Sequence, residues 1–371
     1  MGIMVGLPSP SGSEKDLQLN FGKNMTVQVE MRAPHLPAEW HTQSGIQLTW
    51  PHAGTDWAYM LTEVQECFIN IAREIAKREL LLIVTPEPEE VKKQIAATVN
   101  MNNVRFLECA TNDTWARDHG AITMIDTGNP SLLDFTFNGW GLKFASELDN
   151  LITGQAVKAG ALKGQYIDCL DFVLEGGSIE SDGMGTLLTT TECLLSPNRN
   201  GQLNQVEIEE YLKSTFHLQK VLWLDHGYLA GDDTDSHIDT LARFCSTDTI
   251  AYVKCENKED EHYEALLAME EQLKTFRTLA GEPYRLLALP MADKIEEDGE
   301  RLPATYANFL IMNDAILYPT YQQPDHDRKA AEVLQQAFPE HEIIGIDCRA
   351  LIKQHGSLHC VTMQYPLGVI L

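Results

Sequence analysis

Residues 355–366 place one cysteine, Cys360, directly after a Gly356-Ser357 bend and directly before a short run of β-forming residues. The bend leaves space around the sulfur and the following strand would hold it still, which suits a nucleophile. The reactive species would be the thiolate, and a free cysteine has a pKa of about 8.5. The alternative interpretation is that Cys360 is a small apolar filler of the core. The rest of the chain has to decide between the two.

Residues 233–239, with the sequence Asp-Thr-Asp-Ser-His-Ile-Asp, form the most acidic candidate. Alternate side chains of an extended chain share a face. The sequence therefore predicts one face that carries Asp233, Asp235, His237 and Asp239. Burying so much like charge requires a cation or hydrogen-bond partners. Three interpretations remain open: a site for a cationic ligand, a solvated acidic loop, or a divalent metal site, although the order of residues does not fit an EF-hand.

Trp115 lies three residues before the carboxylate of Asp118. A guanidinium group is flat, stacks on aromatic rings and donates two parallel hydrogen bonds to a carboxylate. This pair could therefore bind a guanidinium, while the alternative for Trp115 is ordinary core packing. We interpret Arg117 as structural, because it would repel a cationic substrate, and expect it to pair with a nearby acid. Arg243 receives the same interpretation.

A third candidate is Glu175, which ends an apolar strand and is followed by Gly176 and Gly177. Glycine allows a close approach of the backbone and a positive φ angle. The functional interpretation is a carboxylate placed against a ligand, and the alternative is an ordinary turn at the end of a strand.

The elements that must position these residues recur along the chain. We expect strands at 46–50, 80–84, 106–110, 121–125, 172–175, 186–191, 221–224 and 342–346, two strands within 306–318, a hairpin at 294–301, and helices at 57–79, 91–99, 205–216, 261–279 and 328–337. The unusual polar positions, separated by 57, 62, 71 and 52 residues, are Asp118, Glu175, His237, Asn308 and Cys360. Such a period indicates an internal repeat. Five strand-helix units around one axis would bring these positions to the centre, and the alternative is chance spacing.

Composition narrows the class of protein. The chain has 371 residues, 54 acidic against 28 basic, and a formal net charge of -26. Nucleic acid and anionic membranes attract basic surfaces, so we expect neither as a partner. The sequence contains no run of eighteen apolar residues, so we expect no membrane span. Eight cysteines without a CxxC pair indicate reduced thiols in a cytoplasmic protein.

Four segments resemble the signatures of one family. Residues 115–120, 175–179, 235–239 and 358–362 are similar to motifs of the agmatine deiminase and bacterial-type peptidylarginine deiminase family, within the guanidine-group-modifying superfamily. The resemblance extends from about Pro34 to Tyr365. It implies an α/β fold, namely a five-bladed, pseudo-symmetric α/β propeller of ββαβ units (a pentein). We expect residues 32–371 to be a single catalytic domain and residues 1–31 to be a leader or a peripheral segment.

The resemblance also implies roles for individual residues. Cys360 would be the nucleophile, and His237 the general acid and base. Asp118 and Asp239 would hold the guanidinium nitrogens, while Glu175 would orient His237 or contact the substrate.

Trp115 and Asn308 complete the expected substrate-binding set, and Trp40, Trp115 and Trp140 are candidates for contacting the far end of the substrate. The expected reaction is hydrolysis of agmatine to N-carbamoylputrescine and ammonia through a covalent alkylthiouronium on Cys360. It requires neither a metal nor an organic cofactor. The rivals are a deiminase of peptidyl or free arginine and a non-catalytic guanidinium-binding protein. Relatives suggest a homodimer or a larger homo-oligomer.

Overall fold

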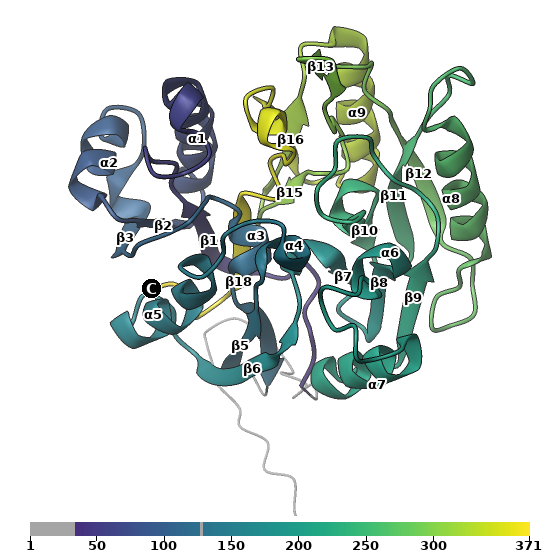
Figure 1. Cartoon of the computed structure of the whole chain (residues 1–371), viewed down its shortest axis with the longest axis horizontal. Coiled ribbons are helices and arrows are strands. Elements are labelled where there is room, and N and C mark those ends of the chain that lie inside the picture. Colours follow the sequence, from purple (N-terminus) through teal and green to yellow (C-terminus); the bar gives the residue numbers. More distant parts are fainter. Residues whose placement is uncertain (1–33, 127–128) are drawn as a thin grey trace, which may run out of the picture.

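The computed structural model of the protein describes residues 34–126 and 129–371. The segment 1–31, expected to be a leader or a peripheral segment, lies outside the described residues. Within them the chain alternates strands and helices, so the predicted α/β class is confirmed (Figure 1).

Five small sheets share one pairing pattern: a first strand pairs antiparallel with a second, which pairs parallel with a third. In four of them the three strands follow one another in sequence. These are β4 (Ile122–Asp126), β5 (Asn129–Thr136) and β6 (Gln165–Val173); β7 (Ile179–Ser181), β8 (Thr186–Thr190) and β9 (Lys220–Leu224); β10 (Ala242–Ser246), β11 (Thr249–Lys254) and β12 (Arg285–Pro290); and β15 (Leu310–Ile311), β16 (Ala315–Thr320) and β17 (Glu342–Asp347).

The fifth sheet joins the two ends of the described chain. Its order is β18 (Thr362–Pro366), β1 (Gln43–Thr49), β2 (Leu80–Thr85) and β3 (Val104–Glu108). The last strand pairs antiparallel with the first one, with Leu48 opposite Thr362. This pairing, visible as the yellow β18 beside the purple β1 in Figure 1, brings the segment around Cys360 next to the N-terminal part of the fold.

Helices connect the parallel strands, because such strands need a crossover connection. Between the second and third strands of the five shared patterns, the longest helix is α1 (Leu61–Ala76), α5 (Ile152–Ala159), α7 (Gln205–Phe216), α8 (Tyr263–Thr275) or α9 (Pro324–Ala337). The remaining helices are α2 (Pro88–Ile95), α3 (Ala116–His119), α4 (Gly139–Leu142) and α6 (Thr191–Leu194).

The sequence patterns account for these elements locally. Helix α1 buries Val64, Phe68 and Ile71 on one face, as their helical spacing predicts. Strand β2 is buried along almost its whole length, as a continuous apolar run predicts for a strand covered on both faces. Helix α7 begins at the residue expected, because Asn204 accepts hydrogen bonds from the first helical N–H groups and forms a capping box.

Several predicted elements differ from the structure in their bounds, and two of them have a clear local reason. Helix α9 begins four residues before the expected Arg328, with Pro324 in its first turn, a position that suits proline. The strand expected from Tyr306 is limited to Leu310–Ile311. The residues before it form a loop instead, in which Thr305 and Asn308 use their side chains to bond other segments. The predicted hairpin at 294–301 is present as β13 (Glu296–Glu297) and β14 (Glu300–Arg301).

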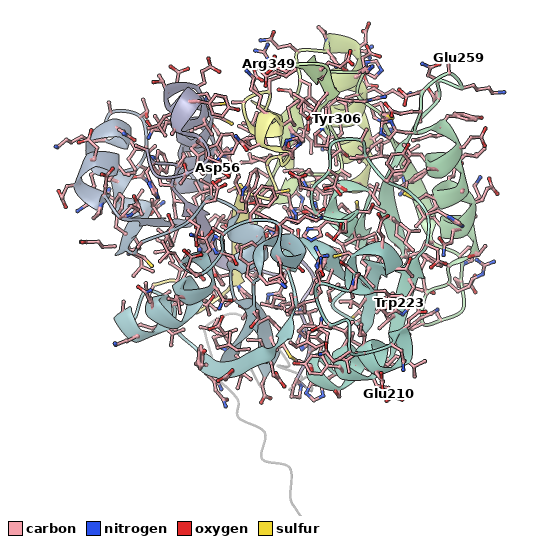
Figure 2. The ribbon with its side chains drawn as sticks, in the orientation of Figure 1. Asp56, Glu210, Trp223, Glu259, Tyr306 and Arg349 are labelled. Atoms are coloured by element: carbon pink, nitrogen blue, oxygen red, sulfur yellow. The ribbon has the colours of Figure 1, made fainter. Side chains whose placement is uncertain are left out.

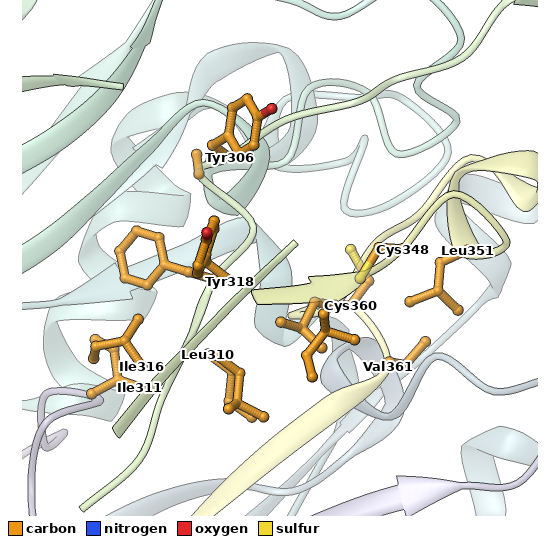
Figure 3. Packing of buried hydrophobic residues seen from close by; sticks show 14 of the residues in the cluster. Tyr306, Leu310, Ile311, Ile316, Tyr318, Cys348, Leu351, Cys360 and Val361 are labelled. Carbon is orange, nitrogen blue, oxygen red and sulfur yellow. The ribbon is translucent and has the colours of Figure 1, made fainter. Parts of the chain in front are cut away.

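The interior contains two apolar clusters that run through several sheets. Figure 2 shows Tyr306 inside the molecule, whereas Glu210, Glu259 and Arg349 project from its margin. Cys360 belongs to the larger cluster, together with Leu310 and Val361 (Figure 3). Among the described residues, no helix combines the length and the apolar character that a membrane crossing requires.

Candidate active site

Turns that lie just before the first strands of the five sheets carry the predicted site residues. These strands hold equivalent positions in the pairing pattern of their sheets, so the residues before them occupy equivalent places although they are distant in sequence. The residues and the strands that follow them are Asp118 before β4, Glu175 before β7, His237 and Asp239 before β10, Asn308 before β15, and Cys360 before β18.

Cys360 is buried, with 4% of its surface exposed. Its Sγ lies 3.4 Å from Oδ1 of Asn308 and 3.9 Å from Oδ2 of Asp239. Burial raises the pKa of the Cys360 thiol well above its usual value, and the charges of Asp239 and Asp118 raise it further. The free protein therefore holds a thiol at this position rather than a thiolate.

Asn308 fixes the backbone that carries the thiol. Its Oδ1 accepts the N–H groups of His359 at 2.8 Å and of Cys360 at 3.3 Å, while its Nδ2 donates to Oδ2 of Asp239 at 3.2 Å. One amide thus links the nucleophile candidate to a carboxylate.

Asp118 accepts two hydrogen bonds from neutral groups. Its Oδ1 accepts the backbone N–H of Gly177 at 3.0 Å, and its Oδ2 accepts Nε1 of Trp140 at 2.9 Å. Burial raises the pKa of Asp118 well above its ordinary value, and the nearby charges of Asp239 and Glu175 raise it further. This carboxyl group is therefore poorly disposed to carry a charge unless a cation approaches.

Asp239 differs, because an imidazole supports its charge. Its Oδ2 contacts Nδ1 of His359 at 2.7 Å. Burial by itself raises the pKa of Asp239, but the hydrogen bond of His359, and its charge when the ring is protonated, lower it, and the net direction is downward. Burial and the charges of Arg117 and Arg243 lower the pKa of His359 itself, so the hydrogen bond is the contribution present in both states of the ring. The other oxygen, Oδ1, is buried without a hydrogen-bond partner, and so is Nε2 of His237. Buried polar atoms without partners are uncommon in proteins, and here two of them belong to side chains that cluster at Gly177 with Asp118.

His237 is almost completely buried. Burial lowers its pKa to about 3, so the ring is neutral at physiological pH. Its Nδ1 lies 3.6 Å from Oδ1 of Asp118. The neutral ring has a lone pair that can accept a proton, but a pKa this low makes His237 a weak base in the free protein.

Two glycines make room for this arrangement. A Cβ atom added at Gly177 would lie 2.6 Å from Nδ1 of His237 and 2.8 Å from Oδ1 of Asp118. A Cβ atom at Gly356 would lie 2.0 Å from the ring of Trp115. Any larger residue would displace the groups around the thiol, which explains the glycine in each motif.

The acidic stretch does not share one face, so that prediction is wrong. Asp235 and Ser236 have φ angles of 63° and 61°, and these left-handed residues turn the chain. As a result Asp235 points to Arg199 and Lys143, at 2.6 Å from each. Of the four side chains expected on one face, Asp239 contacts the thiol and His237 lies with it beside Asp118.

Glu175 is fully buried, and Nε of Arg199 donates to both of its oxygens, at 2.9 and 3.0 Å. Burial raises the pKa of Glu175, and Arg199 opposes that increase. The expected partner was His237 or the substrate, whereas the charged partner in the structure is Arg199. Sequence reasoning missed Arg199, which lies in a loop with no motif around it.

The tryptophans take different positions. Trp140 donates to Asp118, and the ring of Trp115 packs 6.3 Å from that of Trp140 and donates to Asp113. Trp40 is half-buried and packs against the larger apolar cluster. Trp115 and Trp140 therefore stand beside the candidate site.

In a second set of charged groups, near the turn that carries the thiol, each arginine has an acidic partner, although Nε of Arg117 has no hydrogen-bond partner. Arg117 pairs with Glu39 at 3.0 Å, and Arg243 pairs with Glu180 and Glu39, as expected of structural arginines. His359 connects this set to Asp239. Glu39 and His359 were missed; Glu39 gives no signal in sequence, whereas His359 directly precedes Cys360.

We refer to two groups of residues below. The pocket group, which carries the unpartnered atoms, consists of Cys360, His237, Asp118 and Asp239. The ion-pair network consists of Glu39, Arg117, Glu180, Arg243 and His359.

Two sets of described residues bring three potential metal ligands within 4.8 Å of one another. The first is Glu175, Cys193 and His237, and the second is Glu39, Glu180 and His359. In both sets an arginine pairs with a carboxylate of the set: Arg199 in the first and Arg243 in the second. A guanidinium beside the ligands opposes a divalent cation, so neither set favours a metal.

Comparisons with known proteins agree with this geometry. The sequence profile of the Porphyromonas-type peptidyl-arginine deiminase family matches residues 35–366. Agmatine deiminase of Pseudomonas syringae pv. syringae is 32% identical over 356 residues, which cover 90% of this chain and 95% of that protein.

Solved structures are also similar. A Porphyromonas gingivalis protein, provisionally named an arginine deiminase, is 52% identical with a TM-score of 0.86 and covers 91% of this chain and 100% of its own. Agmatine deiminase of C. jejuni with substrate bound is 39% identical with a TM-score of 0.83, over 92% of this chain and 98% of its own. The match extends over nearly the whole described chain. The chain belongs to the Porphyromonas-type peptidyl-arginine deiminase family.

Proposed function

We propose that this protein hydrolyses agmatine to N-carbamoylputrescine and ammonia. One observation carries the proposal: the thiol of Cys360 lies 3.9 Å from Asp239, which clusters at Gly177 with Asp118 and His237, and Oδ1 of Asp239 and Nε2 of His237 have no partner. A planar cation rich in N–H donors supplies the hydrogen bonds and the positive charge that these atoms lack.

The guanidinium would bind between Asp118 and Asp239, which accept its N–H groups. A positive charge next to Asp118 favours the ionised carboxylate, which burial and Asp239 disfavour in the free protein. The same cation favours the thiolate of Cys360. Binding of the cation would thus convert the neutral carboxyl group of Asp118 into a carboxylate and the thiol of Cys360 into a reactive thiolate.

In the first half-reaction the sulfur of Cys360 attacks the guanidinium carbon. Because His237 is neutral in the free protein, it receives the thiol proton and passes it to the departing nitrogen. A C–S bond forms, a C–N bond breaks and ammonia leaves. The product is a cationic alkylthiouronium bound to the protein.

In the second half-reaction water replaces the sulfur. His237 takes a proton from water, the resulting hydroxide adds to the carbon, and the C–S bond breaks. The proton on His237 returns to the sulfur, and the excess proton leaves with the products. The organic product is a urea group in place of the guanidinium, and the thiol is regenerated.

Agmatine is preferred over arginine because the nearby cations are already engaged. An α-carboxylate needs a free positive group, and each described cation that we find around the pocket group pairs with a carboxylate; these are Arg117, Arg199, Arg243 and Lys143. The named agmatine deiminases among the similar proteins support the same substrate.

A deiminase of peptidyl or free arginine is the second candidate. The 52% identical Porphyromonas gingivalis protein, with its provisional name of arginine deiminase, favours it. A non-catalytic guanidinium-binding protein is the weaker alternative, because all the groups needed for turnover are close together.

We further propose that the five sheets form a five-bladed α/β propeller with the pocket group at its axis. Their common pairing pattern supports this arrangement, as does the pairing of β18 with β1. Residues 32–371 would then form one domain, as expected from sequence. A cytoplasmic location and a homodimer or larger oligomer remain predictions.

The test is a direct assay. The purified protein is incubated separately with agmatine, free arginine and an arginyl peptide, and the ureido product and ammonia are measured. We expect kcat/KM to be highest for agmatine. A higher value for either arginine substrate would assign the second candidate, and no product from any of the three would refute the proposed enzyme.

A further inference from the structure

His359 links the pocket group to the ion-pair network. Its Nδ1 lies 2.7 Å from Oδ2 of Asp239, and its Nε2 lies 2.8 Å from Oε1 of Glu39 and 3.1 Å from a terminal nitrogen of Arg243. The ring is fully buried. Both of its nitrogens therefore have a defined partner, in a place where water does not compete.

The contacts fix the proton on Nδ1. An ionised Asp239 can only accept a hydrogen bond, so the imidazole nitrogen that faces it must donate. If Nε2 accepts from Arg243, the ring is neutral and its proton is on Nδ1. If Nε2 donates to Glu39, the ring is an imidazolium and Nδ1 is protonated as well. In both states His359 donates to Asp239.

The network prevents the ring from leaving this position. Glu39 is held by Arg117 and Arg243, and Arg243 is held by Glu180 and by the carbonyls of Ala307 and Phe309. A rotated ring would place a carbon against Asp239 and leave a buried carboxylate oxygen with one donor fewer. Such a loss costs about 1–3 kcal/mol.

The result is an asymmetric carboxylate. One oxygen of Asp239, Oδ2, is occupied by His359 and Asn308 and lies 3.9 Å from the thiol, whereas the other, Oδ1, is buried without a partner. Asp118 has no such imidazole, and both of its oxygens accept from neutral N–H groups. Asp239 is thus the pocket carboxylate that is built to stay charged before a substrate arrives.

We propose that His359, held by Glu39, is a positioning residue that keeps Asp239 ionised and turns its free oxygen toward the guanidinium. This inference rests on the proposed deiminase function of the pocket group. It assigns a role to a residue next to the nucleophile that does not itself touch the reacting atoms.

A matched pair of variants separates this role from simple packing. In His359→Asn the amide group reaches the place of Nδ1 and can still donate to Asp239. In His359→Gln the amide reaches the place of Nε2 and leaves Asp239 without that donor. Loss of a supporting hydrogen bond of this kind lowers activity about 10–100-fold. We expect kcat/KM for agmatine to fall much further in His359→Gln than in His359→Asn.

A second readout follows the charge of Asp239 without turnover. The rate at which iodoacetamide alkylates Cys360 is measured against pH. Without its donor, Asp239 binds a proton more readily and opposes the thiolate less. In His359→Gln the midpoint of alkylation should therefore move down by about one pH unit, whereas in His359→Asn it should stay near that of the wild type. Packing damage that admits water to the thiol would lower the midpoint in both variants, so the difference between His359→Gln and His359→Asn is the readout.

Glu39→Gln provides the same test if a change at His359 prevents folding, which thermal unfolding reports. It keeps a side chain of the same size behind the ring and removes the negative charge that pairs with His359, Arg117 and Arg243, so the midpoint should move down by a smaller amount. The inference is overturned if the Asn and Gln variants at 359 lose activity equally, or if no midpoint moves. Failure of the wild type to turn over agmatine would refute the proposed substrate. The alkylation comparison would still test whether His359 positions Asp239.

Discussion

The pocket group and the ion-pair network are both buried and lie on neighbouring turns, yet they are electrically different. In the network, each carboxylate is paired with an arginine. In the pocket group, carboxylates lie next to one another and to a thiol, and two polar atoms are left without partners. The opposite charges of the ion-pair network balance one another, whereas the pocket group brings carboxylates together without a cation.

This difference shows how the fold can keep an unfavourable site. Removing one partner from a buried ion pair is strongly destabilising, so the network fixes the positions of its backbone segments. Those same segments carry Asp118, Asp239 and Cys360. The pocket group can therefore hold close carboxylates in place because the surrounding pairs prevent the turns from moving apart.

Replacing the nucleophile candidate should produce the largest effect. We expect Cys360→Ala to lower turnover of agmatine by at least about 10⁴-fold, because no covalent intermediate can form. Its free energy of unfolding should change by no more than about 1–2 kcal/mol, since one buried sulfur is lost. Turnover and chemical denaturation are measured together. Turnover close to that of the wild type would mean that the nucleophile is misassigned.

Breaking the network should instead act on stability. Arg243→Met removes the partner of Glu180 and Glu39 and leaves buried negative charge. We expect a loss of about 3–5 kcal/mol in the free energy of unfolding. Arg328→Met is the matched control, because Arg328 is 64% exposed in its side chain and its pairs with Asp325 and Glu332 are worth less than about 1 kcal/mol. Equal losses in the two variants would contradict the proposed contrast.

The pH dependence of the free energy of unfolding should reveal that the pKa of Asp118 is raised in the folded protein. Its pKa is raised in the folded protein, so the folded state keeps this proton when the unfolded chain has released it. Wild-type stability therefore loses a contribution as pH rises above about 4, the ordinary pKa of aspartate, and the loss ends only above the folded pKa. An asparagine at position 118 would not titrate, so it would not cause this pH-dependent loss.

We therefore expect Asp118→Asn to gain stability relative to the wild type between pH 4 and pH 8. The expected gain is about 1.4 kcal/mol for each unit by which the folded pKa is raised. Urea unfolding at a series of pH values gives this difference directly. A constant difference across the range would show that the folded protein does not perturb Asp118.

The smallest effect should come from the indole that supports Asp118. Trp140→Phe removes the 2.9 Å hydrogen bond to Oδ2 and keeps most of the ring. A hydrogen bond to a charged group contributes about 1.5–3 kcal/mol, so we expect KM for agmatine to rise roughly tenfold or more with a smaller change in kcat. Steady-state kinetics measures both. If kcat alone falls, Trp140 contributes to the chemical step and not to substrate binding.

Much of this arrangement could be predicted from sequence. The apolar periods gave α1 and β2, and the recurrence of polar positions at strand starts identified Asp118, Glu175, His237, Asn308 and Cys360. The pairing of Arg117 and Arg243 with acids followed from their charge and is confirmed. The shared face of residues 233–239 failed, because local alternation does not reveal the left-handed turn at Asp235 and Ser236.

The sequence by itself determined which chemical groups the chain can offer and at which recurring turns, because residue type and periodicity are local properties. Only the tertiary structure decided how each group is charged and what it faces. Glu39 lies more than three hundred residues from His359 in the chain but 2.8 Å away in space. The pKa values of Asp118 and Asp239 move in opposite directions for the same reason: the protonation of a buried group is set by the atoms within a few ångströms of it.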